Sequence, residues 1–392
     1  MKYRKFGKLD GKVSALGFGA MRLPVTDRMN PTLIDEPLAI QMMRYAFDNG
    51  VNYVDSAYGY HGGQSEIVVG KALQDGYREK VKLATKCPAW MLQKADDFDR
   101  FLDEQLKKLQ TTKIDVYLFH GLDRTRWPNI RGMDVLPRAE HAIADGRIGC
   151  IGFSFHDEFD TFQNIVDGYD NWAMCQIQYN YLDTENQAGT KGLKYAADKG
   201  IAVVVMEPVR GGRLAKPVEA IAKVWKTSPR QWSAAEWALQ WVWNQPEVAL
   251  ALSGMSTMEQ VVENVVAANR SGTGTLFGDD LALVGRVMEA YKTLYPIPCT
   301  ACGYCMPCPH GVEIPRVFEI YNEAIVFNDP AMGRFMYRGP RGLKEEQRAD
   351  RCAECDTCVE LCPQKINVPE WMKKVHELLG PPPAPPTSAK PA

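Results

Sequence analysis

Eight of the eleven cysteines lie in two runs near the C-terminus. The runs are Cys299, Cys302, Cys305 and Cys308, then Cys352, Cys355, Cys358 and Cys362. Thiols at this spacing can surround one metal centre, and the opening sequence MKYRKFGKLD has no apolar signal segment that would favour disulfides. Two all-cysteine zinc sites would use the same C-x2-C units. Four evenly spaced thiols per run and a proline after each fourth cysteine favour iron–sulfur clusters over zinc.

Both runs resemble the bacterial ferredoxin pattern, in which three cysteines hold one iron–sulfur cube and the fourth reaches the other cube. The resemblance implies a first 4Fe-4S cluster on Cys299, Cys302, Cys305 and Cys362, and a second on Cys352, Cys355, Cys358 and Cys308. The first run departs from the pattern, because two residues instead of three separate Cys305 from Cys308. We expect two clusters. The short spacing affects the second one, because Cys308 is one of its four ligands.

A second group of reactive side chains lies near the ends of short apolar segments. Asp55, Lys86 and His120 each close such a segment, and Tyr60 follows Asp55 by five residues. A tyrosine has an ordinary pKa of about 10 and is a poor proton donor at pH 7 unless a neighbouring cation lowers that pKa. A nearby lysine would do so, an aspartate would keep the lysine charged, and a histidine could orient a carbonyl or relay a proton. Together the four would form an acid–base site.

Eight apolar segments recur along residues 1–290, most of them separated by helix-length stretches. We expect strands at 13–19, 51–55, 81–86, 114–120, 148–154, 173–180, 201–207 and 248–254. Helical periodicity is clear at 37–50 and 234–245. This alternation predicts an α/β fold, a parallel (β/α)8 TIM barrel whose strand ends meet at one mouth. We expect an N-terminal β-hairpin that turns through residues 7–11, with its first strand plugging the bottom of the barrel.

Six segments spread over residues 1–290 carry a family pattern. They are VDSAYGYHGG (54–63), LATKCP (83–88), VYLFHGLD (116–123), IGFSFH (151–156), CQIQYNYLD (175–183) and VENVVAA (262–268). Together they resemble the aldo-keto reductases, whose D-x-A-x-x-Y pattern aligns the catalytic tyrosine with Tyr60 and not with Tyr58. The resemblance implies a catalytic tetrad of Asp55, Tyr60, Lys86 and His120. Tyr60 would be the general acid in the reduction of a carbonyl by NADPH or NADH.

The same resemblance implies a nicotinamide site along the strand ends. The implied residues are Ser154, Gln176, Met206, Arg210, Gly211, Gly212, Ser256, Gln260 and Asn264. The first two match positions at the carboxamide, and the last three match positions at the adenosine end. The loop 207–214 would meet the pyrophosphate, as loops after barrel strands seven and eight often do. Basic residues that often hold the 2′-phosphate are replaced here, so the choice between NADPH and NADH stays open.

Composition and sequence pattern divide the chain into three parts. We expect a barrel over 1–290, a small, mainly helical 4Fe-4S ferredoxin-type domain over 291–380, and a proline-rich, disordered tail over 381–392. The net charge is −2 and there is no long basic run, which argues against nucleic acid as a partner. No run of 18 apolar residues predicts a membrane span. The opening sequence without an apolar signal segment and the metal-type cysteine runs favour a cytoplasmic protein.

These features predict an oxidoreductase that reduces a small aldehyde or ketone with NADPH or NADH and carries fused iron–sulfur clusters. Clusters pass single electrons whereas a hydride carries two, a mismatch that a flavin usually bridges. The G-x-G-x-x-G pattern is absent, but a flavin at a barrel phosphate site would leave no such mark, so flavin stays open. One alternative is an enzyme linked to an external ferredoxin or another electron-transfer protein. The other is a nicotinamide-binding redox sensor or regulatory subunit without turnover, against which the intact tetrad argues.

Overall fold

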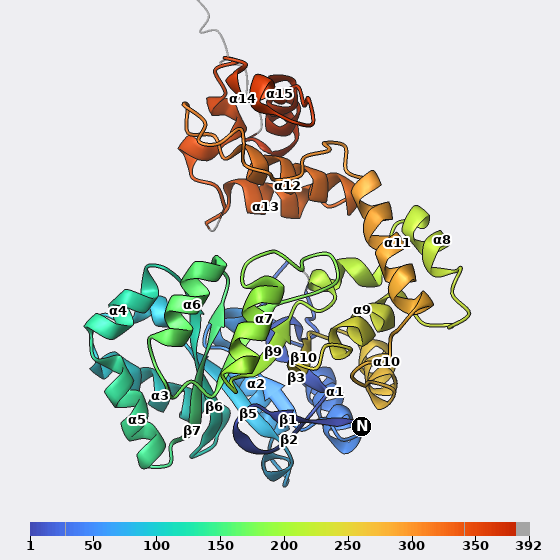
Figure 1. Cartoon of the computed structure of the whole chain (residues 1–392). Helices are drawn as coiled ribbons and strands as arrows, with labels where there is room; N and C mark the ends of the chain where they lie inside the picture. Colours follow the sequence, from blue (N-terminus) through green and yellow to red (C-terminus); the bar gives the residue numbers. More distant parts are fainter. Residues whose placement is uncertain (28, 341, 382–392) are drawn as a thin grey trace, which may run out of the picture. The chain divides into compact units, whose positions relative to one another are not determined.

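The computed structural model describes residues 1–27, 29–340 and 342–381 (Figure 1). Contacts divide the chain into two compact units. The first is Met1–Lys216 with Arg230–Leu281, and the second is Pro217–Pro229 with the residues from Ala282 onward. The expected barrel domain ran without a break to residue 290. The structure differs because Pro217–Pro229 leaves the barrel and makes its contacts within the second unit. Nearly all of the tail expected to be disordered, 382–392, lies outside the described residues.

Eight parallel strands close into a barrel in the first unit, as predicted. They are β3 Leu16–Gly19, β4 Tyr53–Asp55, β5 Lys82–Cys87, β6 Ile114–Leu122, β7 Ile148–Phe155, β8 Met174–Gln178, β9 Ala202–Met206 and β10 Val248–Ser253. The last strand pairs with the first, Leu252 opposite Gly17. Each predicted segment overlaps one of these strands, although β5, β6 and β7 run one or two residues past the predicted ends. The first segment also contains the end of a hairpin strand, because the chain leaves that strand at Ser14, whose hydroxyl donates to the Leu16 carbonyl at 2.6 Å.

An antiparallel hairpin, β1 Tyr3–Phe6 and β2 Leu9–Ser14, precedes the barrel. Its Phe6 and Val13 are buried in one apolar cluster with barrel residues such as Tyr53 and Val204. The turn residue Gly7 has φ +58°, and a Cβ there would lie 2.5 Å from the backbone nitrogen of Ala202. Only glycine combines that conformation with so close an approach. The predicted plug at the bottom of the barrel is confirmed.

Helices surround the strands (Figure 1). They are α1 Glu36–Asp48, α2 Ser65–Ala72, α3 Asp96–Leu109, α4 Arg126–Gly132, α5 Val135–Ala144, α6 Phe159–Asp167, α7 Gly189–Asp198, α9 Ala234–Trp243 and α10 Met258–Asn269. The helix expected at 37–50 is α1, whose N-cap Asp35 accepts a hydrogen bond from Leu38 and whose chain turns at Gly50 with φ +92°. The helix expected at 234–245 is α9.

The second unit is helical, and its described residues contain no strand. Besides α8 Glu219–Trp225 it holds most of α11 Asp279–Thr293, then α12 Ile314–Val326, α13 Pro330–Arg338, α14 Thr357–Leu361 and α15 Val368–Leu379. Its core is small, and six of the cysteines pack against it as partly buried groups. Metal centres would therefore contribute to its stability. No helix in the part of the chain that the structure describes is both long and apolar enough to cross a membrane.

Candidate active site and metal centres

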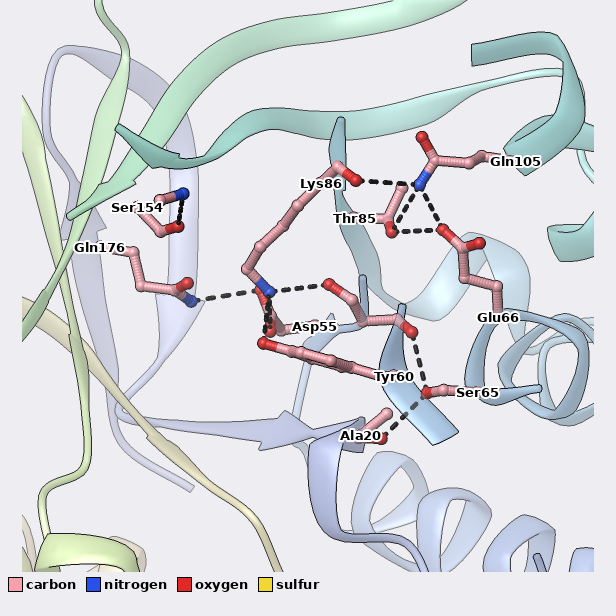
Figure 2. Close-up of polar contacts among 12 residues, drawn as sticks. Ala20, Asp55, Tyr60, Ser65, Glu66, Thr85, Lys86, Gln105, Ser154 and Gln176 are labelled. Carbon is pink, nitrogen blue, oxygen red and sulfur yellow. Dashed lines mark hydrogen bonds and ion pairs between the residues drawn. The ribbon is translucent and has the colours of Figure 1, made fainter. Parts of the chain in front are cut away.

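Lys86 is the centre of a buried polar cluster at the mouth of the barrel (Figure 2). Its ammonium donates to Asp55 Oδ1 at 2.6 Å and to the Ser56 carbonyl at 2.7 Å. It also lies 3.3 Å from the Tyr60 hydroxyl. Strands β4 and β5 are neighbours in register, so their C-terminal ends bring Asp55 and Lys86 together. The sequence predicted this meeting, and the structure shows it.

The charges of this cluster support each other. Burial raises the pKa of Asp55 above its ordinary value, despite the opposing effects of Lys86 and Gln176. Burial alone would lower the pKa of Lys86, but the charges and hydrogen bonds of Asp55 and Tyr60 outweigh it and raise that pKa. Lys86 is therefore a cation at neutral pH. It presents positive charge to the Tyr60 hydroxyl, where negative charge would develop if the tyrosine gave up its proton.

His120 lies on β6 at the same mouth. Its ring centroid is 5.9 Å from that of Tyr60 and 5.1 Å from that of Trp90, edge to face in both cases. Trp90 lies on a short 3-10 helix after β5 and is 42% exposed. It forms an apolar wall beside the ring of His120. The sequence interpretation did not single out Trp90, although its position four residues after Lys86 at a strand end is the signal that could have found it.

Tyr58, the rejected alternative to Tyr60, points elsewhere. Its hydroxyl donates to Glu104 at 3.0 Å and its ring packs edge to face on Phe101 at 5.1 Å. Lys108, and not Lys86, lies over its ring, at 4.1 Å. The geometry therefore agrees with the alignment that places Tyr60 in the tetrad.

A second buried network bonds the backbone carbonyl of Lys86 (Figure 2). Gln105 donates to the Lys86 carbonyl at 3.1 Å and to Glu66, and Thr85 donates to Glu66 at 2.6 Å. Glu66 is fully buried. Burial raises the pKa of its carboxyl, although these donors and Lys108 act in the opposite direction.

Of the predicted cofactor residues, one bonds the tetrad directly and another bonds the residue next to it. Gln176 Nε2 donates to Asp55 Oδ2 at 3.2 Å. Ser154 Oγ accepts a hydrogen bond from the backbone of Gly121, the residue after His120, at 2.8 Å. Both side chains are buried, with Ser154 near the end of β7 and Gln176 in the middle of β8. Met206 ends β9, in register with Gln178 of β8.

The remaining predicted cofactor residues lie on the loops after β9 and β10. Gly211 and Gly212 have φ of +65° and +95°. Asn264 is buried and donates to Ser253 at the end of β10, and Ser256 donates its backbone N–H to Gln260 at the start of α10. Arg210 belongs to the loop that the resemblance places near the pyrophosphate, and its side chain is not open to solvent. It is buried, and its Nε donates to Asp183 at 3.0 Å.

Arg22 is a cation that sequence reasoning missed. Its carbonyl accepts a hydrogen bond from the Ser256 hydroxyl at 2.8 Å. A Cβ built on Gly211 would lie 3.2 Å from Arg22 Nη2, and one built on Gly254 would lie 3.2 Å from its Cδ. The side chain therefore runs between the loops after β9 and β10. Its guanidinium places positive charge beside Gly211, and its aliphatic part lies beside Gly254.

The eight clustered cysteines surround two pockets within the second unit. One is lined by Cys299, Cys302, Cys305 and Cys362, and the other by Cys308, Cys352, Cys355 and Cys358. These are the two predicted sets of four. The short spacing between Cys305 and Cys308 does not keep Cys308 from the second set. Ile314 and Val368 line both pockets, so the pockets are neighbours.

The donor chemistry of both pockets fits iron–sulfur clusters. Each has four thiols and otherwise mostly apolar lining. Burial raises the pKa of Cys299 and of Cys305, and it raises the pKa of Cys358 to about 11. A cation with a high affinity for thiolates is needed to displace these protons at neutral pH.

The profile of the Aldo/keto reductase family matches residues 15–272, which is more than half of the sequence. The chain belongs to this family. A second profile, that of a 4Fe-4S dicluster domain, matches residues 298–366. This aldo-keto reductase is an oxidoreductase with a C-terminal 4Fe-4S domain, as the two resemblances implied. The dicluster match favours iron–sulfur over the zinc alternative.

Several known proteins are similar to this aldo-keto reductase over the barrel. The NADH-specific methylglyoxal reductase of Escherichia coli is 28% identical, with 74% of this chain and 100% of that protein covered. The L-galactose dehydrogenase of Arabidopsis thaliana is 26% identical, with 75% and 96% covered. A solved aldo-keto reductase from Bacillus halodurans, in its holo form, is 26% identical with a TM-score of 0.60, with 73% and 96% covered. One from Klebsiella pneumoniae, in complex with NADP and acetate, is 25% identical with a TM-score of 0.59, with 73% and 95% covered.

Proposed function

We propose that this aldo-keto reductase reduces an aldehyde or ketone, with NADPH or NADH as the hydride donor. The observation that carries the proposal is the buried Lys86 ammonium, which bonds Asp55 at 2.6 Å and lies 3.3 Å from the Tyr60 hydroxyl. The nicotinamide supplies the hydride that reaches the carbonyl carbon. The relative from Escherichia coli is named NADH-specific and the structure from Klebsiella pneumoniae contains NADP, so both cofactors belong in the test.

The residues of the chain supply the proton and the charge. Tyr60 donates its hydroxyl proton to the carbonyl oxygen as that oxygen becomes negative. Lys86 stabilises the tyrosinate that remains, and Asp55 balances the charge of Lys86. His120, whose ring meets that of Tyr60, orients the carbonyl oxygen, and the exposed face of Trp90 packs against the substrate. Solvent then returns the proton to Tyr60.

The amide and hydroxyl of Gln176 and Ser154 would hold the nicotinamide beside the tetrad. Both side chains are buried on neighbouring strands, and Gln176 already bonds Asp55. Loop 207–214 and the guanidinium of Arg22 would meet the phosphates. The start of α10, with Ser256, would meet the adenosine end.

The second unit is proposed to hold two 4Fe-4S clusters, one on each set of four cysteines. Such clusters carry single electrons, whereas carbonyl reduction by a nicotinamide moves a hydride. The clusters are therefore proposed to be structural or regulatory and to stand outside the hydride step. One observation favours a second role, which is electron exchange with an external ferredoxin or a similar protein. Each set of four contains one exposed cysteine, Cys302 in the first and Cys355 in the second.

Anaerobic stopped-flow absorbance separates these roles. Purified protein is mixed with NADPH or NADH, first alone and then with a panel of aldehydes and ketones, while the nicotinamide and cluster bands are followed. The proposal expects carbonyl-dependent oxidation of one of the two cofactors and no cluster bleaching within a turnover. Cofactor binding without product would favour the sensor alternative. Fast bleaching of the cluster band together with an electron paramagnetic resonance signal of reduced clusters would place the clusters in the electron path. Flavin released on denaturation would support the same conclusion.

A further inference from the structure

A buried polar network joins the ends of β8 and β9, next to the residues of the proposed active site. Its centre is Asp183, whose Oδ2 accepts hydrogen bonds from Gln178 Nε2 at 3.0 Å, Asn180 Nδ2 at 2.9 Å and Arg210 Nε at 3.0 Å. Asp183 is 7% exposed and Asn180 is fully buried. Asn180 also reaches the next loop, because its Nδ2 donates to the Glu207 carbonyl at 3.3 Å. Nothing in the proposed proton transfer uses this network.

The loop that the network holds has an unfavourable backbone. Between residues 207 and 212 four residues have positive φ: Glu207 (+54°), Arg210 (+49°), Gly211 (+65°) and Gly212 (+95°). Two of these four are not glycine, and such residues adopt this conformation only when surrounding contacts enforce it. The contacts to Asp183 and Asn180 act at Arg210 and Glu207, which are these two residues. The network therefore acts where the loop is most strained.

The ion pair between Asp183 and Arg210 is placed to hold the loop in position. The Asp183 and Arg210 side chains are each 8% exposed, so their ion pair is largely shielded from water and salt. Arg210 uses its Nε for Asp183, and the carboxylate oxygen that receives it also receives two amide donors. Several donors fix the position of a buried carboxylate, and the fixed carboxylate in turn restricts the positions of the donor side chains.

We propose that Asp183 is a positioning residue for the cofactor-binding loop of this enzyme. Through Arg210 it fixes residues 207–212 in the conformation that receives the pyrophosphate of NADPH or NADH, before the cofactor arrives. Arg210 then contributes to cofactor binding by ordering the loop and not by reaching into solvent as a phosphate ligand. The inference rests on the proposed function, because the loop is assigned to the cofactor there. It adds the reason that an arginine within the loop is buried.

The test compares Asp183→Asn with Asp157→Asn. The control removes a carboxylate from another arginine pair, formed by Arg124 after β6 and Asp157 after β7. An asparagine at 183 keeps the shape but loses the charge that three donors share. The dissociation constants of NADPH and NADH, measured by fluorescence titration, should rise about tenfold, which corresponds to about 1.4 kcal/mol. At saturating cofactor kcat should stay within about twofold of the parent, and the control should change neither quantity.

Two further measurements keep the inference falsifiable. Amide hydrogen exchange without cofactor should become faster over residues 207–214 in Asp183→Asn and not in the control. Arg210→Lys, which keeps the charge but not the Nε donor, should weaken cofactor binding to a similar degree, and the double variant should be no worse than the stronger single variant. Unchanged cofactor affinity and unchanged loop exchange in folded Asp183→Asn would overturn the inference. If the parent protein bound neither cofactor, the proposed function would be wrong. Hydrogen exchange would still test separately whether Asp183 orders the loop.

Discussion

Replacing Tyr60 with phenylalanine removes one atom from the centre of the proposed chemistry. The ring contacts to His120, at 5.9 Å, and to the Lys86 ammonium, at 4.8 Å, can persist in the variant. The Asp55–Lys86 pair at 2.6 Å does not involve the lost hydroxyl. The variant should therefore fold normally and bind cofactor as the parent does. Its defect should be confined to proton donation.

The magnitude follows from the role of the hydroxyl. A positioned general acid contributes a factor of about 10² to 10⁴ in rate, which equals about 2.7 to 5.4 kcal/mol of transition-state stabilisation. Tyr60→Phe should lower kcat for carbonyl reduction by that factor and leave the cofactor dissociation constant within about twofold. The assay is steady-state oxidation of NADPH or NADH with an active aldehyde, paired with fluorescence titration of cofactor binding.

Tyr58→Phe is the matched control. Its hydroxyl bonds Glu104 in a partly exposed position and lies outside the tetrad. The loss of one such bond should cost about 0.5–1.5 kcal/mol of folding free energy and leave kcat unchanged. If Tyr58→Phe abolished turnover while Tyr60→Phe was mild, the assignment of the general acid would be wrong.

Three further results are expected. Anaerobically purified protein should contain about eight irons per chain, and Cys308→Ser should retain about four, by metal analysis; stoichiometric zinc would contradict the cluster assignment. Asp55→Asn leaves the Lys86 ammonium buried without its partner, so urea unfolding should show a loss of about 3–5 kcal/mol, against less than about 1 kcal/mol for the exposed control Asp48→Asn. The raised pKa of Glu66 means that the folded state binds the proton of this carboxyl more tightly than the unfolded state does. The free energy of unfolding should therefore fall as pH rises above about 4.3 and through the raised pKa. Glu66→Gln should remove this part of the fall in urea unfolding measured across pH, and an unaltered profile in the variant would contradict the raised pKa.

Much of the site could be predicted because its signals are local in the sequence. A strand that ends at Asp55 and a tyrosine five residues later need only the pattern of one segment, and strand periodicity then places Lys86 and His120 at the same mouth. The cysteine runs are equally local, since their spacing limits which thiols can reach one centre. Closure of the barrel followed from the number and alternation of segments.

Other features depended on contacts between distant parts of the chain. Arg22 lies 234 residues before Ser256, and only the pairing of β10 with β3 brings their loops together. The excursion of Pro217–Pro229 out of the barrel has no local signature, because those residues are defined by what they pack against.

Arg210 shows most clearly what the sequence could not settle. Its place in a loop after a barrel strand predicted a cation near the pyrophosphate. The structure buries it against Asp183, which is 27 residues away in the loop after the neighbouring strand β8. Sequence patterns therefore determined which residue types reach the mouth of the barrel. Only the tertiary structure decided which of them face a ligand and which hold the others in place, because burial and pairing depend on neighbours that the chain supplies from elsewhere.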